Sequence, residues 1–203
     1  MDDALQLPVI ESDSAERADA ARNRGRILCA ARRLFDERGA GCVSMDDVAE
    51  AAGVGKGTLF RRFGSRASLA AAVLSERERD FQEAIIRGEP PLGPGACARE
   101  RLVAFGEALL DTLDAHCDLL LMAETGPARF AHPAYGVHRL HVTLLLHEAE
   151  PERDAELLAD TLLAALGAEL FVYLREVRGM PLQRLKDGWR ELVLRSLPVA
   201  ELR

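Results

Sequence analysis

The segment from Ser44 to Leu69, which reads SMDDVAEAAGVGKGTLFRRFGSRASL, constrains the fold of this chain more than any other. Ser44 is a favourable N-cap for a helix whose first turn holds two acidic residues, and Gly53 is expected to end that helix. After a turn at residues 54–55, a second short helix is predicted over residues 56–63. Two short helices joined by a tight, glycine-containing turn form a helix-turn-helix, and its second helix can enter the major groove of DNA.

The rest of the sequence also predicts helices. Apolar residues recur every three or four positions from Ile27 to Phe35, which places them on one face of a helix. The glycine- and proline-rich stretch 88–95 is expected to be a loop. Further helices are predicted over residues 66–87, 97–116, 118–123, 132–148, 152–178 and 182–196. Because no alternating run of β-branched residues competes with these patterns, we expect an all-α chain.

The charge of the chain is unevenly distributed. The formal net charge is −7, from 33 acidic and 26 basic side chains. Residues 17–70 nevertheless hold eleven basic and six acidic side chains, whereas residues 71–203 hold fifteen basic and twenty-two acidic ones. A basic block joined to an acidic body indicates an anion-binding module, with a solvated charged face as the alternative.

Composition excludes several classes of protein. A hydrophobic content of 48% is too high for disorder over most of the chain. The most apolar run, residues 157–177, contains four charged residues, so no membrane partner is expected. The first residues, Met-Asp-Asp, do not look like a secretory signal, and the four cysteines form no Cys-x-x-Cys pair. We expect a reduced, cytoplasmic protein without a cofactor.

The sequence favours neither a metal site nor a thiol switch. Histidines cluster between residues 132 and 147, with Cys117 and Glu124 upstream, but no second pair of ligands has a fixed spacing. No neighbour of Cys97 or Cys117 clearly lowers the pKa of its thiol. The prediction is therefore no metal and no reactive cysteine.

Residues 22–75 resemble the N-terminal DNA-binding domain of the TetR family of transcriptional repressors. Two positions depart from the family pattern, because Phe60 replaces the usual tyrosine and Arg66 replaces the usual lysine. The resemblance is carried by Ser44, Val48-Ala49, Ala52-Gly53-Val54, Lys56-Gly57-Thr58-Leu59-Phe60, Phe63, Arg66 and Leu69.

The resemblance implies a set of DNA-binding residues. They are Ser44, Lys56, Gly57, Thr58, Phe60, Arg61, Arg62 and Arg66. Of these, Ser44, Thr58 and Arg66 are expected to hold phosphates, and Lys56 and Arg62 to read bases, because long donors reach guanine edges. Arg61 and Arg62 could instead be solvated surface charges. Three arginines at positions 22, 24 and 26 could grip a phosphate or the minor groove, or merely keep the start of the helix soluble.

The predicted organisation is a mobile arm over residues 1–20, a helix-turn-helix domain over residues 21–66 and a larger helical domain for ligand binding and dimerisation over residues 67–203. The last helices are apolar on more than one face, so they must be buried on more than one side. Packing within the chain could account for this, but the resemblance favours a homodimer. The expected interface is Leu162, Leu166, Leu170, Leu174, Leu185 and Leu192.

The acidic body is expected to hold a small-molecule pocket, because its apolar side chains carry a few polar tips. Most of these residues are expected to be ordinary core. The candidate lining is Phe81, Phe105, Leu109, Leu120, Met122, Phe130, Tyr135, His138 and Trp189. The resemblance implies that a ligand there weakens DNA binding by moving the two DNA-binding domains through the fourth helix.

The sequence thus predicts a dimeric, sequence-specific transcriptional regulator, not an enzyme. It is expected to repress from a palindromic operator on double-stranded DNA and to be released by an unidentified small-molecule effector. The alternative is a helical ligand-binding or interaction protein, or an enzyme, on the same scaffold with weak or lost DNA binding.

Overall fold

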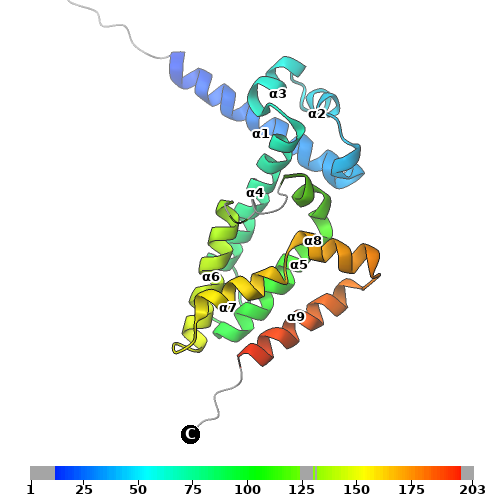
Figure 1. Cartoon of the computed structure of the whole chain (residues 1–203). Coiled ribbons are helices and arrows are strands. Elements are labelled where there is room, and N and C mark those ends of the chain that lie inside the picture. The colour runs from blue at the N-terminus through cyan, green and yellow to red at the C-terminus, as the bar shows by residue number, and fades with distance from the viewer. Residues whose placement is uncertain (1–11, 124–129, 131, 198–203) are drawn as a thin grey trace, which may run out of the picture. The chain divides into compact units, whose positions relative to one another are not determined.

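The computed structural model describes residues 12–123, 130 and 132–197, and in this part of the chain it contains helices and no β-strands (Figure 1). The all-α prediction is therefore confirmed. The chain divides into two compact units, one up to Leu69 and one from Ala70 onward.

The first unit is a small helical domain. It comprises α1 (Ser12–Arg38), η1 (Ala40–Cys42), α2 (Met45–Ala52), α3 (Lys56–Phe63) and the first residues of α4 (Arg66–Arg87). Helix α2 packs against both α1 and α3. The apolar positions of the predicted periodicities are buried between these helices, and they include Ile27, Leu28, Leu34, Phe35, Val48, Ala49, Leu59 and Phe63.

Helix α1 begins earlier than the sequence pattern predicted. Residues 12–20 were expected to belong to a mobile arm because they lack periodic apolar side chains, but they form the first turns of α1. Alanines and charged residues that favour helices dominate this stretch, and Asp19 pairs with Arg22 one turn later. Helix propensity rather than amphipathicity accounts for the difference. The remainder of the arm, residues 1–11, lies outside the described residues.

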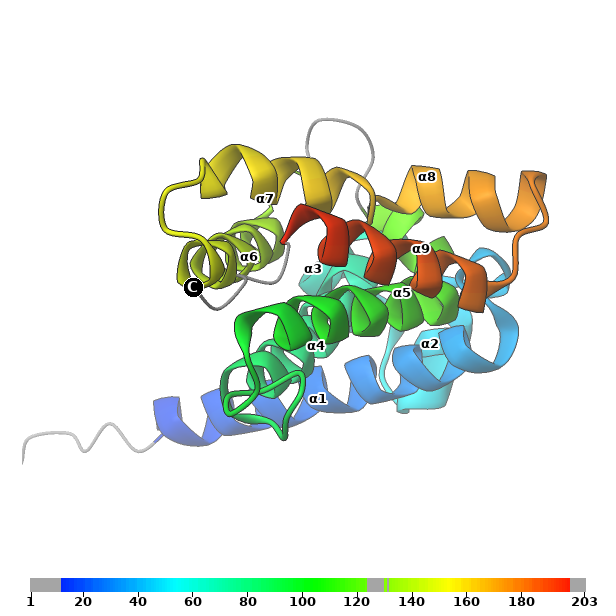
Figure 2. The ribbon, with the colours of Figure 1, turned by 90° about the horizontal axis from the view of Figure 1, so that it is seen from below.

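The second unit is built around one long helix. It comprises the rest of α4 and then α5 (Ala98–Ala123), α6 (Pro133–Ala149), α7 (Ala155–Ala164), α8 (Ala168–Val172), the π-helical segment η3 (Tyr173–Val177) and α9 (Leu182–Ser196). Helix α5 packs against α6, α8 and α9, while α6 packs against α7. Figure 2 shows α9 running beside α5. The core of this unit is therefore centred on the inner face of α5.

The breaks in two helical regions differ from those that the sequence predicted. The expected break between residues 116 and 118 is a kink inside α5, where His116 has φ −143° and ψ 22°. The helix predicted over residues 152–178 is interrupted, because Gly167 is extended (φ −74°, ψ 141°) between α7 and α8. The sequence prediction of one continuous helix there was wrong.

The stretch Ala155–Val177 is long and apolar enough to cross a membrane by length and composition alone. In the structure it is divided among three helical segments, and Ala159, Leu162, Leu163 and Phe171 are buried in the core of the second unit. Burial within the fold therefore accounts for part of its apolar character, while Leu157, Leu170, Tyr173 and Val177 are exposed.

Candidate DNA-binding surface and ligand cavity

Helix α2 is fixed at both ends. The Ser44 hydroxyl accepts a hydrogen bond from the Asp47 amide (3.1 Å), and the Asp47 carboxylate accepts one from the Ser44 amide (2.8 Å), which forms a capping box. The Ser44 hydroxyl also donates to the Asp47 carboxylate (2.6 Å), and this bond, followed by the one from the Ser44 amide, lowers the pKa of Asp47 below its usual value. At the other end Gly53 is left-handed (φ 62°, ψ 40°), and its amide bonds the Ala49 carbonyl. The helix-turn-helix is thus set by local backbone chemistry.

Helix α3 buries one face and exposes the other. Leu59 and Phe63 point into the core of the first unit. The exposed face carries residues predicted to contact DNA: Lys56, Gly57, Phe60, Arg61 and Arg62, with Thr58 half-buried. Phe60 is 48% exposed, unusually open for a phenylalanine. Helix α3, anchored by these two side chains, therefore presents three cations and an exposed aromatic ring on its outer surface.

Lys56 has a partner in the free protein. Its ammonium nitrogen lies 2.5 Å from a carboxylate oxygen of Asp46, on α2, and both side chains are exposed. An exposed ion pair of this kind contributes little to stability. Lys56 can therefore exchange this partner for a base or phosphate at small cost.

Several arginines predicted to meet phosphates bind the protein itself. Arg66 is half-buried and donates to the Ala40 carbonyl. Arg26 donates to the carbonyls of Ala52 (2.7 Å) and Gly53 (3.3 Å), which satisfies the end of α2. The Arg24 guanidinium lies 5.2 Å from the centre of the Phe63 ring. In the free protein these cations support the helix-turn-helix; their DNA contacts remain a prediction.

A cavity of about 140 Å³ lies in the second unit, between α4, α5, α6 and the α7–α8 junction. Five predicted lining residues do line it: Phe81, Leu109, Leu120, Tyr135 and His138. Phe105 instead belongs to the core, and Phe130 is 53% exposed. The Met122 side chain lies outside the described part of the chain.

Trp189 does not line this cavity, although the sequence predicted that it would. It is buried against α5, where its indole Nε1 donates to the carbonyls of Leu102 (3.2 Å) and Val103 (3.1 Å). A Cβ atom added at Gly106 would lie 2.0 Å from the indole ring. Trp189 therefore locks α9 onto α5 and does not line this cavity.

Sequence reasoning missed the polar side chains of the cavity wall. These are Arg77, Glu78, Thr112, His132 and Glu169. The missed signal was the spacing of residues 74, 77, 78 and 81, which places four lining residues on one face of α4.

The cavity contains a buried contact between two titratable groups. His138 Nε2, on α6, lies 3.0 Å from Glu78 Oε1, on α4. The imidazole also packs edge-on against the rings of Phe81 (5.4 Å between centroids) and Phe105 (5.5 Å). This contact connects two helices that line the cavity.

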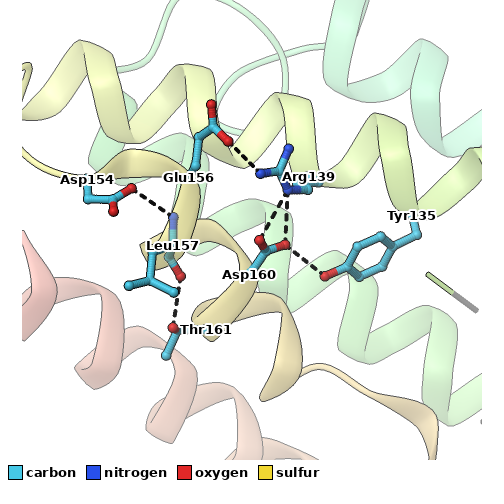
Figure 3. A network of polar contacts seen from close by, with 7 residues as sticks. All are labelled: Tyr135, Arg139, Asp154, Glu156, Leu157, Asp160 and Thr161. Carbon is cyan, nitrogen blue, oxygen red and sulfur yellow. Dashed lines mark hydrogen bonds and ion pairs between the residues drawn. The ribbon is translucent and has the colours of Figure 1, made fainter. Parts of the chain in front are cut away.

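A polar network braces the wall formed by α6 and α7 (Figure 3). The Tyr135 hydroxyl donates to Asp160 (3.1 Å), and Arg139 donates to both Asp160 (3.1 Å) and Glu156 (2.8 Å). Hydrogen bonding to Glu156 and Asp160 raises the pKa of Arg139. The network holds the Tyr135 ring in place at the cavity.

The predicted dimer residues fall into three groups by exposure. Leu162 and Leu166 are buried in the core of their own chain, so their expected role in an interface with another chain was wrong. Leu174 and Leu185 are half-buried. Leu170 and Leu192 remain 41% and 40% exposed, and Tyr173, Val177 and Leu194 are exposed as well.

No group of three or more histidine, cysteine or acidic side chains in the described residues could hold a metal ion, and Glu124 lies outside them. Burial is the main cause that lowers the pKa of His141 to about 4, with smaller effects from Arg101 and His138. Burial also raises the pKa of the Cys117 thiol to about 11. Cys117 is therefore protonated at neutral pH, which argues against a reactive thiol.

Comparison with known proteins identifies relatives. Residues 27–73 match the family described as bacterial regulatory proteins, tetR family. The chain is 28% identical over 173 residues to an HTH-type transcriptional regulator of Staphylococcus aureus (strain MRSA252), covering 84% of this chain and 92% of that one. A probable HTH-type transcriptional regulator of Pseudomonas putida, ArpR, is 33% identical over 47% of each chain.

Solved structures share the fold. A transcriptional regulator from Saccharomonospora viridis in complex with choline has a TM-score of 0.67 at 22% identity, covering 85% of this chain and 96% of that one. The regulator FadR from Bacillus subtilis in complex with stearoyl-CoA has a TM-score of 0.63 at 16% identity, covering 88% and 100%. The likeness therefore extends through both units.

Proposed function

We propose that this chain acts as a cytoplasmic homodimeric repressor. The premise is that its N-terminal domain makes it a DNA-binding transcriptional regulator of the TetR family. In this proposal each protomer reads one half of a palindromic operator through α3. A small molecule in the cavity of the second unit releases the protein from DNA.

The observation that carries the DNA-binding proposal is the exposed face of α3. Lys56, Arg61 and Arg62 are exposed there, while Leu59 and Phe63 anchor the opposite face in the core. A cationic helix held rigidly at a surface suits the major groove, where lysine and arginine donate to guanine. Ser44 and Thr58 are proposed to hold phosphates beside it.

Dimerisation is supported by the exposed apolar side chains at the end of the chain. Leu170, Tyr173 and Val177 on α8 and η3, with Leu192 and Leu194 on α9, are all at least 40% exposed. Apolar patches of this kind are typical of protein interfaces. A second copy of the same surface would cover them in a two-fold arrangement, which also matches two operator half-sites.

Ligand control is supported by the position of the cavity. Helix α4 has its first turn in the unit that contains α3, and Leu74, Arg77, Glu78 and Phe81 of the same helix line the cavity. A ligand that binds one α4 conformation better than the other shifts the population of DNA-binding protein. Two structural neighbours were solved in complex with small molecules, choline and stearoyl-CoA, which supports a small-molecule ligand for this chain.

The decisive experiment is a gel shift on a palindromic fragment from upstream of the gene with the double variant Lys56→Ala, Arg62→Ala. Each good base contact is worth about 1–3 kcal/mol, so the double variant should bind at least about 30-fold more weakly. The matched control is Arg87→Ala, Arg195→Ala, which removes two exposed cations from the second unit. Undiminished binding by the α3 double variant would refute the site.

The alternative, a helical binding or interaction protein that has lost DNA binding, is motivated by Phe60 and the net acidity. A salt titration separates the two, because phosphate contacts make the logarithm of affinity fall linearly with the logarithm of salt concentration. A steep slope on the operator supports the regulator. Absence of binding even at low salt, with intact protein, supports the alternative, and chemical turnover of a bound compound would indicate an enzyme.

A further inference from the structure

A carboxylate is built into the wall of the cavity. Glu78 lies on α4 among apolar lining residues, and its side chain is only 19% exposed. A carboxylate removed from water is unfavourable unless charged or hydrogen-bonding partners compensate it. Glu78 is therefore the group on this wall that gains most from a positive ligand.

The two polar groups that contact the Glu78 carboxylate do not supply a permanent positive charge. Its Oε1 accepts a hydrogen bond from Gln82 Nε2 at 2.8 Å and lies 3.0 Å from His138 Nε2. The first neighbour is neutral and the second is titratable, so neither is a permanent cation. Arg77, which is permanently charged and also lines the cavity, contacts the His116 ring at the kink of α5.

A second acidic group lines the cavity on α8. Glu169 lies beside Ala168, whose carbonyl is 3.8 Å from the Cys117 sulfur. After burial, the causes that raise the pKa of this thiol are the charges of four carboxylates: Glu176, Asp118, Glu169 and Asp114. Glu169, an exposed residue, therefore adds a second carboxylate to the cavity lining, while Asp114 is already paired with Arg175 at 2.8 Å.

The other walls suit a cation with an apolar part. The rings of Phe81 and Tyr135 line the cavity, and aromatic faces attract ammonium groups. Leu109, Leu113, Leu120 and Leu163 supply apolar surface. We propose that the cavity binds a small organic ammonium ion, with its charged head against Glu78 and its hydrocarbon part along these leucines. The assignment rests on the proposed function in that it treats this cavity as the effector site.

Three probes of the same chain length test the charge preference of the full-length protein. Hexylammonium, hexan-1-ol and hexanoate carry a positive, neutral and negative head on one six-carbon chain. By calorimetry, hexylammonium should bind at least about tenfold more tightly than hexan-1-ol, and hexanoate more weakly than either, because a charge-assisted contact in a desolvated site is stronger than a neutral one. Equal affinities, or a preference for hexanoate, would overturn the proposal.

The variant Glu78→Gln assigns the preference to one side chain. It keeps the shape of Glu78 and removes its charge, so the affinity for hexylammonium should fall at least about tenfold while that for hexan-1-ol stays unchanged. Glu83→Gln is the matched control, because Glu83 is an exposed acid on the same helix, paired with Arg87. If Glu78→Gln fails to fold, the probe comparison on the unmodified protein still decides.

The outcomes separate this inference from the proposed function. If the protein binds its operator normally but shows no preference for hexylammonium, the proposed ligand class is wrong and the proposed regulatory function stands. If the protein prefers hexylammonium but does not bind the operator, the proposed ligand class stands and the proposed regulatory function is wrong. Weakening of hexylammonium binding by Glu83→Gln as much as by Glu78→Gln would show a general effect of charge and would refute the role of Glu78.

Discussion

At the residue scale, Phe60 is the most informative departure from the family pattern. It is 48% exposed on the face of α3 proposed to meet DNA, where the usual tyrosine carries a hydroxyl. We predict that Phe60→Tyr binds the operator up to about tenfold more tightly, because one added neutral hydrogen bond contributes about 0.5–1.5 kcal/mol. Titration of labelled operator measures the change.

The matched control for that substitution is Phe130→Tyr, which adds the same hydroxyl to a similarly exposed phenylalanine of the second unit. It should leave operator affinity unchanged. Equal affinities of Phe60→Tyr and the unmodified protein would mean that the ring of residue 60 does not reach a phosphate.

A second prediction at this scale concerns the pairing of Lys56 with Asp46, which are 2.5 Å apart. Asp46→Asn removes the competitor for the Lys56 ammonium and a negative charge from the surface proposed to face DNA. Affinity for any duplex should rise, and random DNA should gain at least as much as the operator, which lowers specificity. Parallel titrations measure the affinity for both duplexes. The control is Glu50→Gln, which alters an exposed acid at the other end of α2. A gain confined to the operator would contradict it.

At the element scale, the packing of α9 on α5 depends on the missing side chain of Gly106. A Cβ atom there would lie 2.0 Å from the Trp189 ring, so Gly106→Ala must push the indole away from its bonds to the carbonyls of Leu102 and Val103. We predict a loss of about 1–3 kcal/mol in the free energy of unfolding, typical of overpacking. Urea unfolding measures it.

Gly136→Ala serves as the control for that prediction. Gly136 is a helical glycine on α6 with open space around its Cβ position, so alanine should be neutral or slightly stabilising there. If Gly106→Ala were equally neutral, the close approach of Trp189 would not constrain the packing of α9.

The elements show what sequence could and could not predict. Helix α3 was placed at residues 56–63 and is found at Lys56–Phe63, because glycines mark its ends. The interruption at Gly167 was missed, since apolar residues continue through it and no proline marks it. The early start of α1 was missed because helix propensity without amphipathicity leaves no periodic signal.

The sites differ in the same way. Six of the eight predicted DNA-binding residues lie on α3, so their common surface follows from helical spacing alone, whereas Ser44 caps α2 and Arg66 begins α4. The cavity is assembled from α4, α5, α6, α7 and α8, and whether Phe105 or Phe81 faces it depends on how these helices pack. That information lies in long-range packing, which residue type does not disclose.

At the scale of the whole molecule, stability should depend on pH through His141. Burial holds its pKa at about 4, below the usual 6.5, so the unfolded chain binds this proton more readily than the folded one. The stabilising contribution is complete above about pH 6.5 and is lost as the pH falls toward 4. We predict that His141→Leu loses less thermal stability between pH 7 and pH 4.5 than the unmodified protein.

His147→Leu is the control for that pH dependence, because His147 is an exposed histidine on the same helix. Its melting temperature should follow the unmodified protein over the same pH range. Parallel curves for His141→Leu and the unmodified protein would mean that this imidazole is not held neutral by the fold.

Assembly is the remaining property of the whole molecule. Leu170 and Leu192 are about equally exposed on the surface proposed to meet a second copy. The double variant Leu170→Glu, Leu192→Glu would bury unpaired carboxylates in that interface, so we predict at least a hundredfold weaker dimer, because each unpaired charge costs several kcal/mol. Sedimentation measures the dimer, and a gel shift should show weaker binding to the full palindrome with little change on a single half-site.

The control is Leu140→Glu, Leu144→Glu, which alters two leucines of α6 that are 59% and 58% exposed. If that control dissociates while the first variant stays dimeric, the two-fold contact lies on α6 and the surface of α8, η3 and α9 serves another purpose.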